Sequence, residues 1–242
     1  MKRLFLPALL AFPIWTITAD DLDQSLDSEE SAQTATAITI IFDNSGSMAD
    51  KGKLKQAKNA FTAWLDTLPP EYSLALIDFK TGKARLAVPL GAENRQAVRD
   101  HVAKVTAYGK TPICDCLKIA QSQIAERRTK HSPYERHVVI VFTDGKETVD
   151  RRGDRGVMEE IMKLRNAVVE VVGIGFHGQG DYMRPAATRY YHASDEEELA
   201  SGLAKVDAEI GDDADIEITQ SDMDMIEKTK IPLPPAPGGG KQ

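Results

Sequence analysis

The feature that most limits the fold of this chain is an apolar run that stops at a small cluster of oxygen-bearing side chains. Residues 38–42 are I-T-I-I-F, and residues 43–47 are D-N-S-G-S. A short, β-branched and almost wholly apolar run is typical of a strand buried on both faces, as in parallel sheets. In open α/β sheets, ligand sites lie beyond the carboxyl ends of such strands. The pattern therefore predicts a parallel sheet with a site after residue 42.

The side chains after this run form a set of hard oxygen ligands. Asp43, Ser45 and Ser47 alternate along the chain, and Gly46 lets the backbone turn tightly enough for them to converge. One carboxylate and two hydroxyls suit Mg²⁺, Mn²⁺ or Ca²⁺ better than a soft metal. The competing interpretation is a polar strand-to-helix turn in which a Ser or Asp caps the helix. Because the motif is short, the choice depends on the rest of the chain.

The D-N-S-G-S sequence resembles the metal-ion-dependent adhesion motif, Asp-x-Ser-x-Ser, of the von Willebrand factor type A domain family. Two later turns extend this resemblance. Residues 108–113, Y-G-K-T-P-I, are similar to the Gly-Gly-Thr-Pro-like turn of the family, with Lys110 in place of the second glycine. Residues 143–145, T-D-G, follow the apolar run H-V-V-I-V-F and are similar to the family's Thr-Asp-Gly. The resemblance covers about residues 37–210.

The resemblance implies a metal site built from three strand ends. The five residues that it implies as ligands of one divalent cation are Asp43, Ser45, Ser47, Thr111 and Asp144. In type A domains the serines bind the ion directly, and the Thr and the aspartates bind directly or through water. Mg²⁺ is the expected ion, with Mn²⁺ and Ca²⁺ as alternatives. A coordination position left to solvent would accept an acidic side chain from a protein partner, which makes partner binding metal-dependent. Lys110 places a cation nearby, which would weaken metal binding or attract an anionic partner.

The order of the apolar patterns predicts the architecture of residues 37–210. Strand-like runs alternate with amphipathic helical patterns, which predicts an α/β fold with a Rossmann-like, open and mostly parallel sheet. Helices are expected on both faces of this sheet. Residues 84–90 alternate in polarity after a turn at 81–83, which predicts one antiparallel edge strand beside strand 72–79. The helices are expected at 53–68, 94–105, 112–128, 157–166 and 195–210, and the remaining strands at 137–142, 168–174 and 189–193.

The two ends of the chain differ in composition from its centre. A basic start, an apolar run and Ala19 predict a signal peptide at 1–19, hence a periplasmic or secreted protein, with a retained membrane anchor as the alternative. We expect a flexible acidic leader at 20–36 and a disordered, acidic then Pro/Gly-rich tail at 211–242. Removing Lys2 and Arg3 would change the formal charge from −7 to −9. This charge argues against nucleic-acid binding, and no membrane insertion is expected after cleavage.

Three local patterns carry weaker signals. Cys114 and Cys116 lie two apart on an expected helix, so their side chains diverge, which predicts small, partly buried, unbridged thiols. A Cys-x-Cys metal or redox site is the alternative. Thr111 and Ser194 are expected helix N-caps, the latter with a capping-box glutamate three residues later. Residues 173–178, G-I-G-F-H-G, match the dinucleotide fingerprint formally, but no helix pattern follows at once.

These patterns favour a non-enzymatic, metal-dependent protein-binding module. The first alternative is a metal-dependent hydrolase. It is disfavoured because Ser45 and Ser47 lack the G-x-S-x-G elbow, and the five histidines show no zinc-ligand spacing. The second alternative is a scaffold that keeps the fold but has a vestigial metal site. Divalent-metal binding without turnover of model phosphate or ester substrates would separate the leading interpretation from the hydrolase.

Overall fold

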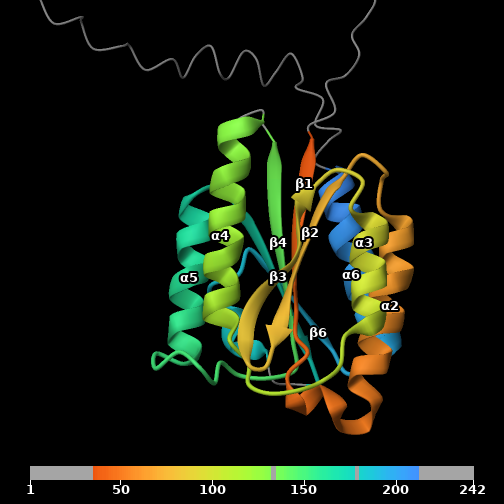
Figure 1. The fold of residues 1–242 in the computed structure, drawn as a ribbon, viewed down its shortest axis with the longest axis vertical. Coiled ribbons are helices and arrows are strands. Elements are labelled where there is room, and N and C mark those ends of the chain that lie inside the picture. The colour runs from red at the N-terminus through yellow and green to blue at the C-terminus, as the bar shows by residue number, and fades with distance from the viewer. Residues whose placement is uncertain (1–34, 132–134, 178–179, 213–242) are drawn as a thin grey trace, which may run out of the picture. The chain divides into compact units, whose positions relative to one another are not determined.

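The computed structural model describes residues 35–131, 135–177 and 180–212 of the chain. These residues form a six-stranded sheet in the order β3-β2-β1-β4-β5-β6 (Figure 1). Every neighbouring pair is parallel except β2 with β3, which pair antiparallel at one edge. The expected Rossmann-like, mostly parallel sheet with one antiparallel edge strand is confirmed.

The strands and helices alternate along the chain as expected, with limits that differ from the predicted ones by up to three residues. The strands are β1 (Thr36–Phe42), β2 (Ser73–Lys80), β3 (Lys83–Gly91), β4 (Arg136–Thr143), β5 (Glu170–Phe176) and β6 (Arg189–Ala193). The α-helices are α2 (Lys53–Thr67), α3 (Arg95–Lys104), α4 (Ile113–Lys130), α5 (Asp154–Asn166) and α6 (Glu196–Asp212). Short 3₁₀ segments follow β1 and β5: η1 (Gly46–Gly52) and η2 (Asp181–Met183).

Two apolar layers hold the helices against the sheet. Helices α2, α3 and α6 pack on one face, and α4 and α5 pack on the other (Figure 1). β1 lies between two strands and two helical layers, so every one of its residues is buried. This double burial explains why its sequence is almost continuously apolar rather than alternating.

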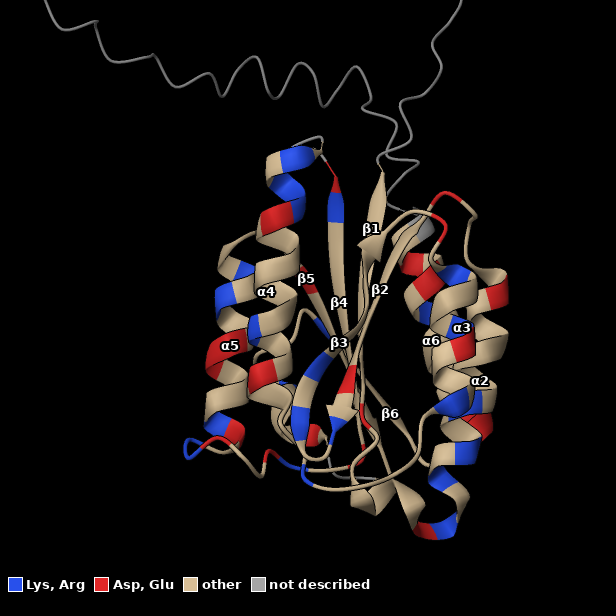
Figure 2. Cartoon of the chain, in the orientation of Figure 1, with Lys and Arg blue, Asp and Glu red and all other residues tan. Residues whose placement is uncertain are grey.

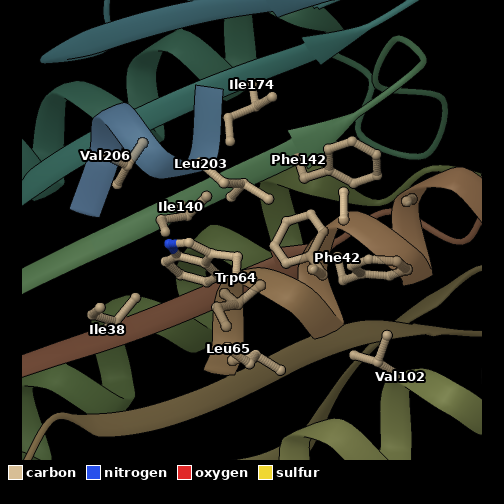
Figure 3. Close-up of a cluster of buried hydrophobic side chains, with 14 of the residues drawn as sticks. Ile38, Phe42, Trp64, Leu65, Val102, Ile140, Phe142, Ile174, Leu203 and Val206 are labelled. Carbon is tan, nitrogen blue, oxygen red and sulfur yellow. The ribbon is translucent and has the colours of Figure 1, made fainter. Parts of the chain in front are cut away.

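An aromatic cluster fills the first layer at the ends of β1 and β4 (Figure 3). The rings of Phe42 and Phe142 lie 5.4 Å apart. Phe61 of α2 packs edge-on against both, at 5.1 and 5.2 Å between ring centroids. Such ring pairs contribute about 0.5–1.5 kcal/mol each beyond their buried area. Because Phe42 and Phe142 directly precede Asp43 and Thr143, this packing fixes where the polar ends of both strands begin.

Two expected helix caps are wrong. The N-cap position of α4 is occupied by Pro112 rather than Thr111, which leaves Thr111 in the preceding turn. At α6 the capping box is shifted by one residue. Asp195 Oδ1 accepts the Glu198 N–H at 2.9 Å, and Glu198 Oε2 accepts the Ser194 N–H at 2.7 Å. A reciprocal pair of this kind satisfies two amide groups at the start of a helix, and Asp and Ser are interchangeable in the role.

The glycines of the dinucleotide-like stretch have a packing role. β5 continues through Phe176, and the short segment η2 is the only helical element among the residues described between β5 and β6. A Cβ atom on Gly175 would overlap the hydroxyl group of Tyr190, and one on Gly173 would lie 3.0 Å from the Tyr190 ring. Glycine at both positions therefore makes room for the Tyr190 side chain, and among the described residues no α-helix directly follows β5 to form a phosphate cradle.

The expected signal peptide at 1–19 lies outside the described residues, as do nearly all of the expected leader at 20–36 and tail at 211–242. The last residue assigned to the leader, Thr36, is the first residue of β1 and pairs with Arg136 of β4. Among the helices that the structure describes, none is long and apolar enough to cross a membrane.

Candidate metal centre

Asp43 stands at the carboxyl end of β1 and is fully buried. Its backbone N–H donates to Phe142 O at 3.1 Å, which extends the pairing of β1 with β4 by one residue. Its carboxylate accepts two hydrogen bonds: Oδ1 from the Ser45 N–H at 2.7 Å and Oδ2 from the Thr143 hydroxyl at 2.5 Å. The carboxylate is thus held between the two central strand ends by neutral donors.

A row of side-chain oxygens lies beyond the ends of β1 and β4, and it is formed by Ser45, Ser47 and Asp144. Ser45 Oγ lies 3.1 Å from Ser47 Oγ, and the Ser47 hydroxyl donates to Asp144 Oδ1 at 2.7 Å. Asp144 follows β4 directly and is 1% exposed. The two hydroxyls of the turn after β1 are therefore linked by hydrogen bonds in a chain to the carboxylate of the turn after β4.

Thr111 approaches this row from the turn before α4. A Cβ atom placed on Gly145 would lie 3.8 Å from both Ser47 Oγ and Thr111 Oγ1, so these two hydroxyls flank the same glycine. Reciprocal bonds with Thr148 hold the turn: the Thr111 N–H donates to Thr148 Oγ1 at 2.8 Å, and the Thr148 N–H donates to Thr111 O at 3.1 Å. The five side chains singled out in the sequence thus lie at one edge of the sheet. The expectation of three strand ends is wrong in one respect, because Thr111 lies in the loop between α3 and α4, whereas the other four follow β1 and β4.

Asn44 holds these loops together, and sequence reasoning missed it. Its side chain accepts the Phe79 N–H at 2.8 Å and donates to Phe79 O and Thr106 O at 2.9 and 3.1 Å. Its backbone carbonyl accepts the Tyr108 N–H at 2.9 Å. Asn44 therefore links the end of β1 to the end of β2 and to the turn that carries Thr111. The motif contains an unspecified position here, so no local signal pointed to this role.

The turn before α4 tolerates lysine in place of the second glycine. The left-handed conformation falls on Gly109 (φ 86°), and Lys110 is not among the residues with positive φ. A Cβ atom on Gly109 would lie 2.9 Å from Gly82 N, so this glycine is required by a close backbone approach as well as by its φ angle. The Gly46 N–H also donates to Gly109 O at 3.0 Å.

Lys53 is the second residue that sequence reasoning missed. Its ammonium group lies 2.6 Å from Asp144 Oδ2, and its side chain is 13% exposed. Lys53 is the first residue of α2 and follows a kink in which Lys51 and Gly52 have positive φ. The sequence placed it among lysines on the solvent face of a helix. Only the kink, which a periodicity argument cannot anticipate, turns it back toward the strand ends.

The two carboxylates of this edge have different electrostatic surroundings, since Asp144 has Lys53 beside it and Asp43 has no cationic partner. Burial raises the pKa of Asp43 from 3.8 to about 6, opposed by the hydrogen bonds from Thr143 and Ser45 and reinforced by the charge of Asp144. Within the described residues no group of three or more His, Cys, Asp or Glu side chains gathers to hold a metal ion. The donor set is instead two carboxylates with three hydroxyls, which fits Mg²⁺, an ion that keeps several waters and takes one or two carboxylates.

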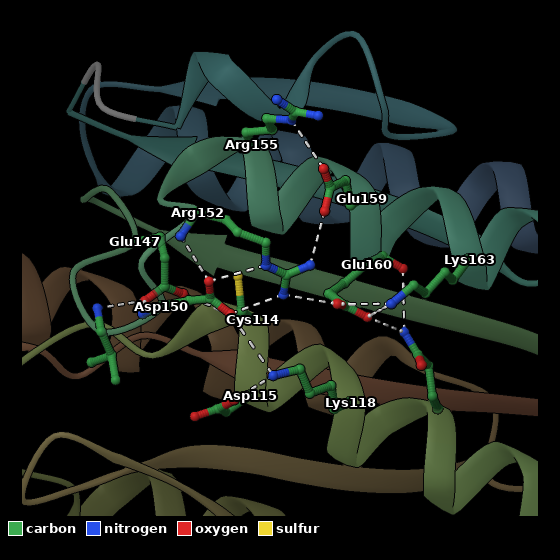
Figure 4. A network of polar contacts seen from close by, with 12 residues as sticks. Cys114, Asp115, Lys118, Glu147, Asp150, Arg152, Arg155, Glu159, Glu160 and Lys163 are labelled. Carbon is green, nitrogen blue, oxygen red and sulfur yellow. Dashed lines mark hydrogen bonds and ion pairs between the residues drawn. The ribbon is translucent and has the colours of Figure 1, made fainter.

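The loop after Asp144 is anchored to α4 and α5 by the network of Figure 4. Glu147 accepts N–H bonds from Cys114 at 2.7 Å, from Val149 at 2.7 Å and from Asp150 at 3.0 Å. The Arg152 guanidinium group then links Asp150 to the glutamates of α5. These contacts fix the loop that follows Asp144 against both helices.

Cys114 and Cys116 are free thiols, in agreement with the expected absence of a bridge between them. Both are fully buried rather than partly buried. Burial raises the pKa of both thiol groups, which keeps them protonated and poor as metal ligands or nucleophiles. They pack as small apolar side chains between α4 and the sheet.

The fold and the site together define an open α/β domain with an oxygen-rich candidate metal centre at the carboxyl edge of its sheet. Residues 38–147 match the family model of the von Willebrand factor type A domain. Two curated relatives are inter-alpha-trypsin inhibitor heavy chain H4 of Homo sapiens and of Sus scrofa, 28% and 27% identical over 144 residues. The match covers 57% of this chain but only 15% of either relative.

Solved structures show the same fold. The vWF domain of the type V pili tip protein from Porphyromonas gingivalis is 10% identical, with a TM-score of 0.65 over 78% of this chain and 99% of that one. A von Willebrand factor type A structure from Catenulispora acidiphila is 22% identical, with a TM-score of 0.61 over 74% of this chain and 43% of that one. The family model supports the von Willebrand factor type A domain family for residues 38–147, and these solved structures show that the fold is shared.

Proposed function

We propose that this protein is a metal-dependent protein-binding module. The observation that best supports this is the hydrogen-bonded row formed by Ser45, Ser47 and Asp144 beside the buried carboxylate of Asp43. When bound, a divalent cation supplies positive charge there and an open coordination position for an acidic side chain of a protein partner. Mg²⁺ is the expected ion, and Mn²⁺ or Ca²⁺ would fit the same hard oxygens.

Each residue of the set has a distinct role in this proposal. Ser45 and Ser47 are direct ligands, whereas Asp43, Thr111 and Asp144 bind the ion directly or through water. The Thr143 hydroxyl and the Ser45 N–H orient the Asp43 carboxylate. Asp43 and Asp144 are the two anionic members of the set, and the three hydroxyls, being neutral, add no charge that would repel an acidic partner.

We propose no catalytic activity for this site. The Ser45 hydroxyl bonds to that of Ser47, and the Ser47 hydroxyl donates to Asp144. In the described part of the chain no histidine is hydrogen-bonded to either serine hydroxyl. A hydrolase would need an activated nucleophile with a base beside it. We further propose that the protein acts outside the cytoplasm, which the basic and apolar sequence at 1–19 supports.

Calorimetry with Mg²⁺ and Mn²⁺ tests the site, with Asp43→Ala and Asp144→Ala compared against the wild type. Asp115→Ala, which removes a half-exposed carboxylate on α4, is the matched control. We expect metal binding to be lost in the two site variants and retained in the control. Equal binding by the wild type and Asp43→Ala would show that the residue assignment is wrong. Partner capture that survives chelation would overturn the metal bridge.

A second candidate, a scaffold with a vestigial metal site, is favoured by one observation. The Lys53 ammonium group already sits 2.6 Å from Asp144 and neutralises that carboxylate without any ion. For a scaffold, the stability of the fold and the capture of partners would both be indifferent to chelator. The same calorimetric titration distinguishes the two functions, because a vestigial site gives no heat of binding with either metal.

A further inference from the structure

A groove lies beside the candidate metal centre, between α3 and the β2–β3 hairpin. It is a hollow of about 400 Å³, and its lining includes Asn44, which lies between the proposed ligands Asp43 and Ser45 in the chain. The Tyr108 N–H donates to Asn44 O, so a second lining residue is tied to the loop that carries Asp43 and Ser45. The groove and the candidate metal centre therefore share the loop that follows β1.

The walls of the groove are basic, although the chain as a whole carries a formal charge of −7. Figure 2 shows Lys and Arg on the β2–β3 hairpin and at the C-terminal end of α3. The cationic lining residues are Lys80, Arg85 and Lys104. Lys80 and Lys104 are exposed, and neither forms an ion pair with any described carboxylate. Cations concentrated in a depression focus the electric field and attract anionic ligands.

The one carboxylate of the lining does not oppose this field. Asp78 is fully buried, and both of its oxygens are occupied. Arg85 donates to Oδ1 at 2.7 Å and to Oδ2 at 2.5 Å, and His101 Nε2 lies 2.8 Å from Oδ2. Asp78 therefore fixes Arg85 in the groove wall, while the lysines remain available to a ligand.

Tyr108 adds an aromatic contact at the mouth of the groove. Its side chain is 65% exposed, one of few large apolar side chains so exposed among the described residues. Its backbone is fixed by the Asn44 carbonyl, so the ring is presented from a held position. Exposed tyrosines of this kind provide large contact area with little loss of conformational entropy, and they are enriched in protein interfaces.

We propose that this groove binds an acidic segment of the partner protein. The inference rests on the proposed function: one carboxylate of the partner reaches the metal centre, and its neighbouring Asp or Glu side chains pair with Lys80 and Lys104. Tyr108 packs against the backbone of the same segment. The groove thus selects a run of acidic residues rather than a single one, and the metal centre sets the register of that run.

The test measures binding of a short fluorescent peptide of alternating Asp and Gly by fluorescence anisotropy, in Mg²⁺ and in chelator. The key variant is Lys80→Glu with Lys104→Glu. The control is Lys130→Glu with Lys205→Glu, which makes the same change of net charge on α4 and α6. In Mg²⁺ we expect the groove variant to bind about tenfold more weakly, because each exposed ion pair is worth about 0.2–1 kcal/mol and is replaced by repulsion. The control should change the affinity by less than about twofold.

The outcomes separate the groove from the metal centre. Equal affinity of the groove and control variants would overturn the groove, even if chelator abolishes binding and so supports the proposed function. Loss in the groove variant with no effect of chelator or of Asp43→Ala would overturn the metal bridge and leave the groove. Tighter, metal-independent binding of a single-stranded oligonucleotide of equal charge would overturn the peptide as the ligand class. Circular dichroism melting of each variant excludes misfolding as the cause.

Discussion

The two edges of the parallel sheet differ in how completely they pair their acidic side chains with cations. At the amino edge Glu135 is held by the guanidinium group of Arg127 through bonds of 2.7–3.1 Å. Glu170 is paired there with Arg136 and Arg189 at 2.6 and 2.7 Å. At the carboxyl edge the buried Asp43 has only neutral donors. The amino edge is thus neutralised by the chain itself, whereas at the carboxyl edge Lys53 neutralises Asp144 and leaves the neighbouring Asp43 without a cationic partner.

The largest expected effect comes from removing the cation of a buried ion pair at the amino edge. Arg127→Met leaves Glu135, whose side chain is 2% exposed, without its cation. Removing one partner of a buried pair costs about 3–5 kcal/mol, because the other charge remains buried. Urea denaturation should show this loss with or without Mg²⁺. Lys130→Met is the control: it breaks an exposed pair with Glu126 and should cost less than about 1 kcal/mol.

The second largest expected effect is the pH dependence of folding stability that Asp43 causes when a chelator keeps the protein free of metal. A buried carboxyl whose pKa is raised to about 6 binds its proton more tightly in the folded state than in the unfolded state. Folding stability should therefore be highest below about pH 4 for this group and should fall as the pH rises through about 6. The shift corresponds to about 3 kcal/mol. Asp43→Asn should remove that dependence, as judged by denaturation at pH 4 and pH 8.

The matched control for this experiment is Asp115→Asn, because that side chain is half exposed on α4. It should leave the pH dependence of stability as in the wild type. An Asp43→Asn protein that still loses about 3 kcal/mol between pH 4 and pH 8 would show that Asp43 is not the group responsible. Mg²⁺ added at pH 8 should restore stability to the wild type only.

The smallest expected effect concerns Lys53. Its ammonium group pairs with Asp144, so an ion that uses the same carboxylate must displace it. Lys53→Met should raise the Mg²⁺ affinity by about tenfold, which is about 1.4 kcal/mol. Calorimetry measures this directly, and Lys55→Met, which changes an exposed lysine two residues further along α2, should leave the affinity unchanged. An unchanged or weaker affinity in Lys53→Met would show that the lysine supports metal binding rather than opposing it.

The sequence predicted the order of the elements and the parallel sheet well, because buried strands and amphipathic helices leave periodic patterns. It also identified the five oxygen donors that the structure brings to one edge, because short sequence motifs mark the turns that carry them. It missed Lys53 and Asn44 for a different reason. Lys53 reaches Asp144 only through the kink at Lys51, and the partners of Asn44 lie 35 and 62 residues away. Contacts of this range leave no local pattern.

The two helix caps were misassigned for a local reason. Ser194 and Asp195 are adjacent and equally suited to cap, so composition alone does not choose between them. At α4 the side chain of Thr111 was assigned two roles, as a cap and as a ligand. The structure places Pro112 at the N-cap position, which leaves the Thr111 hydroxyl beside Gly145.

The contact between Gly82 and Gly109 has a consequence for how this sequence can change. A Cβ atom on Gly109 would lie 2.9 Å from the backbone of Gly82, and one on Gly82 would lie 3.1 Å from the backbone of Lys110. The hairpin turn and the loop that carries Thr111 therefore share a single narrow space. A side chain at either position would push the hairpin and the loop apart. Replacing both glycines would add two side chains to the same space, so neither loss would compensate for the other.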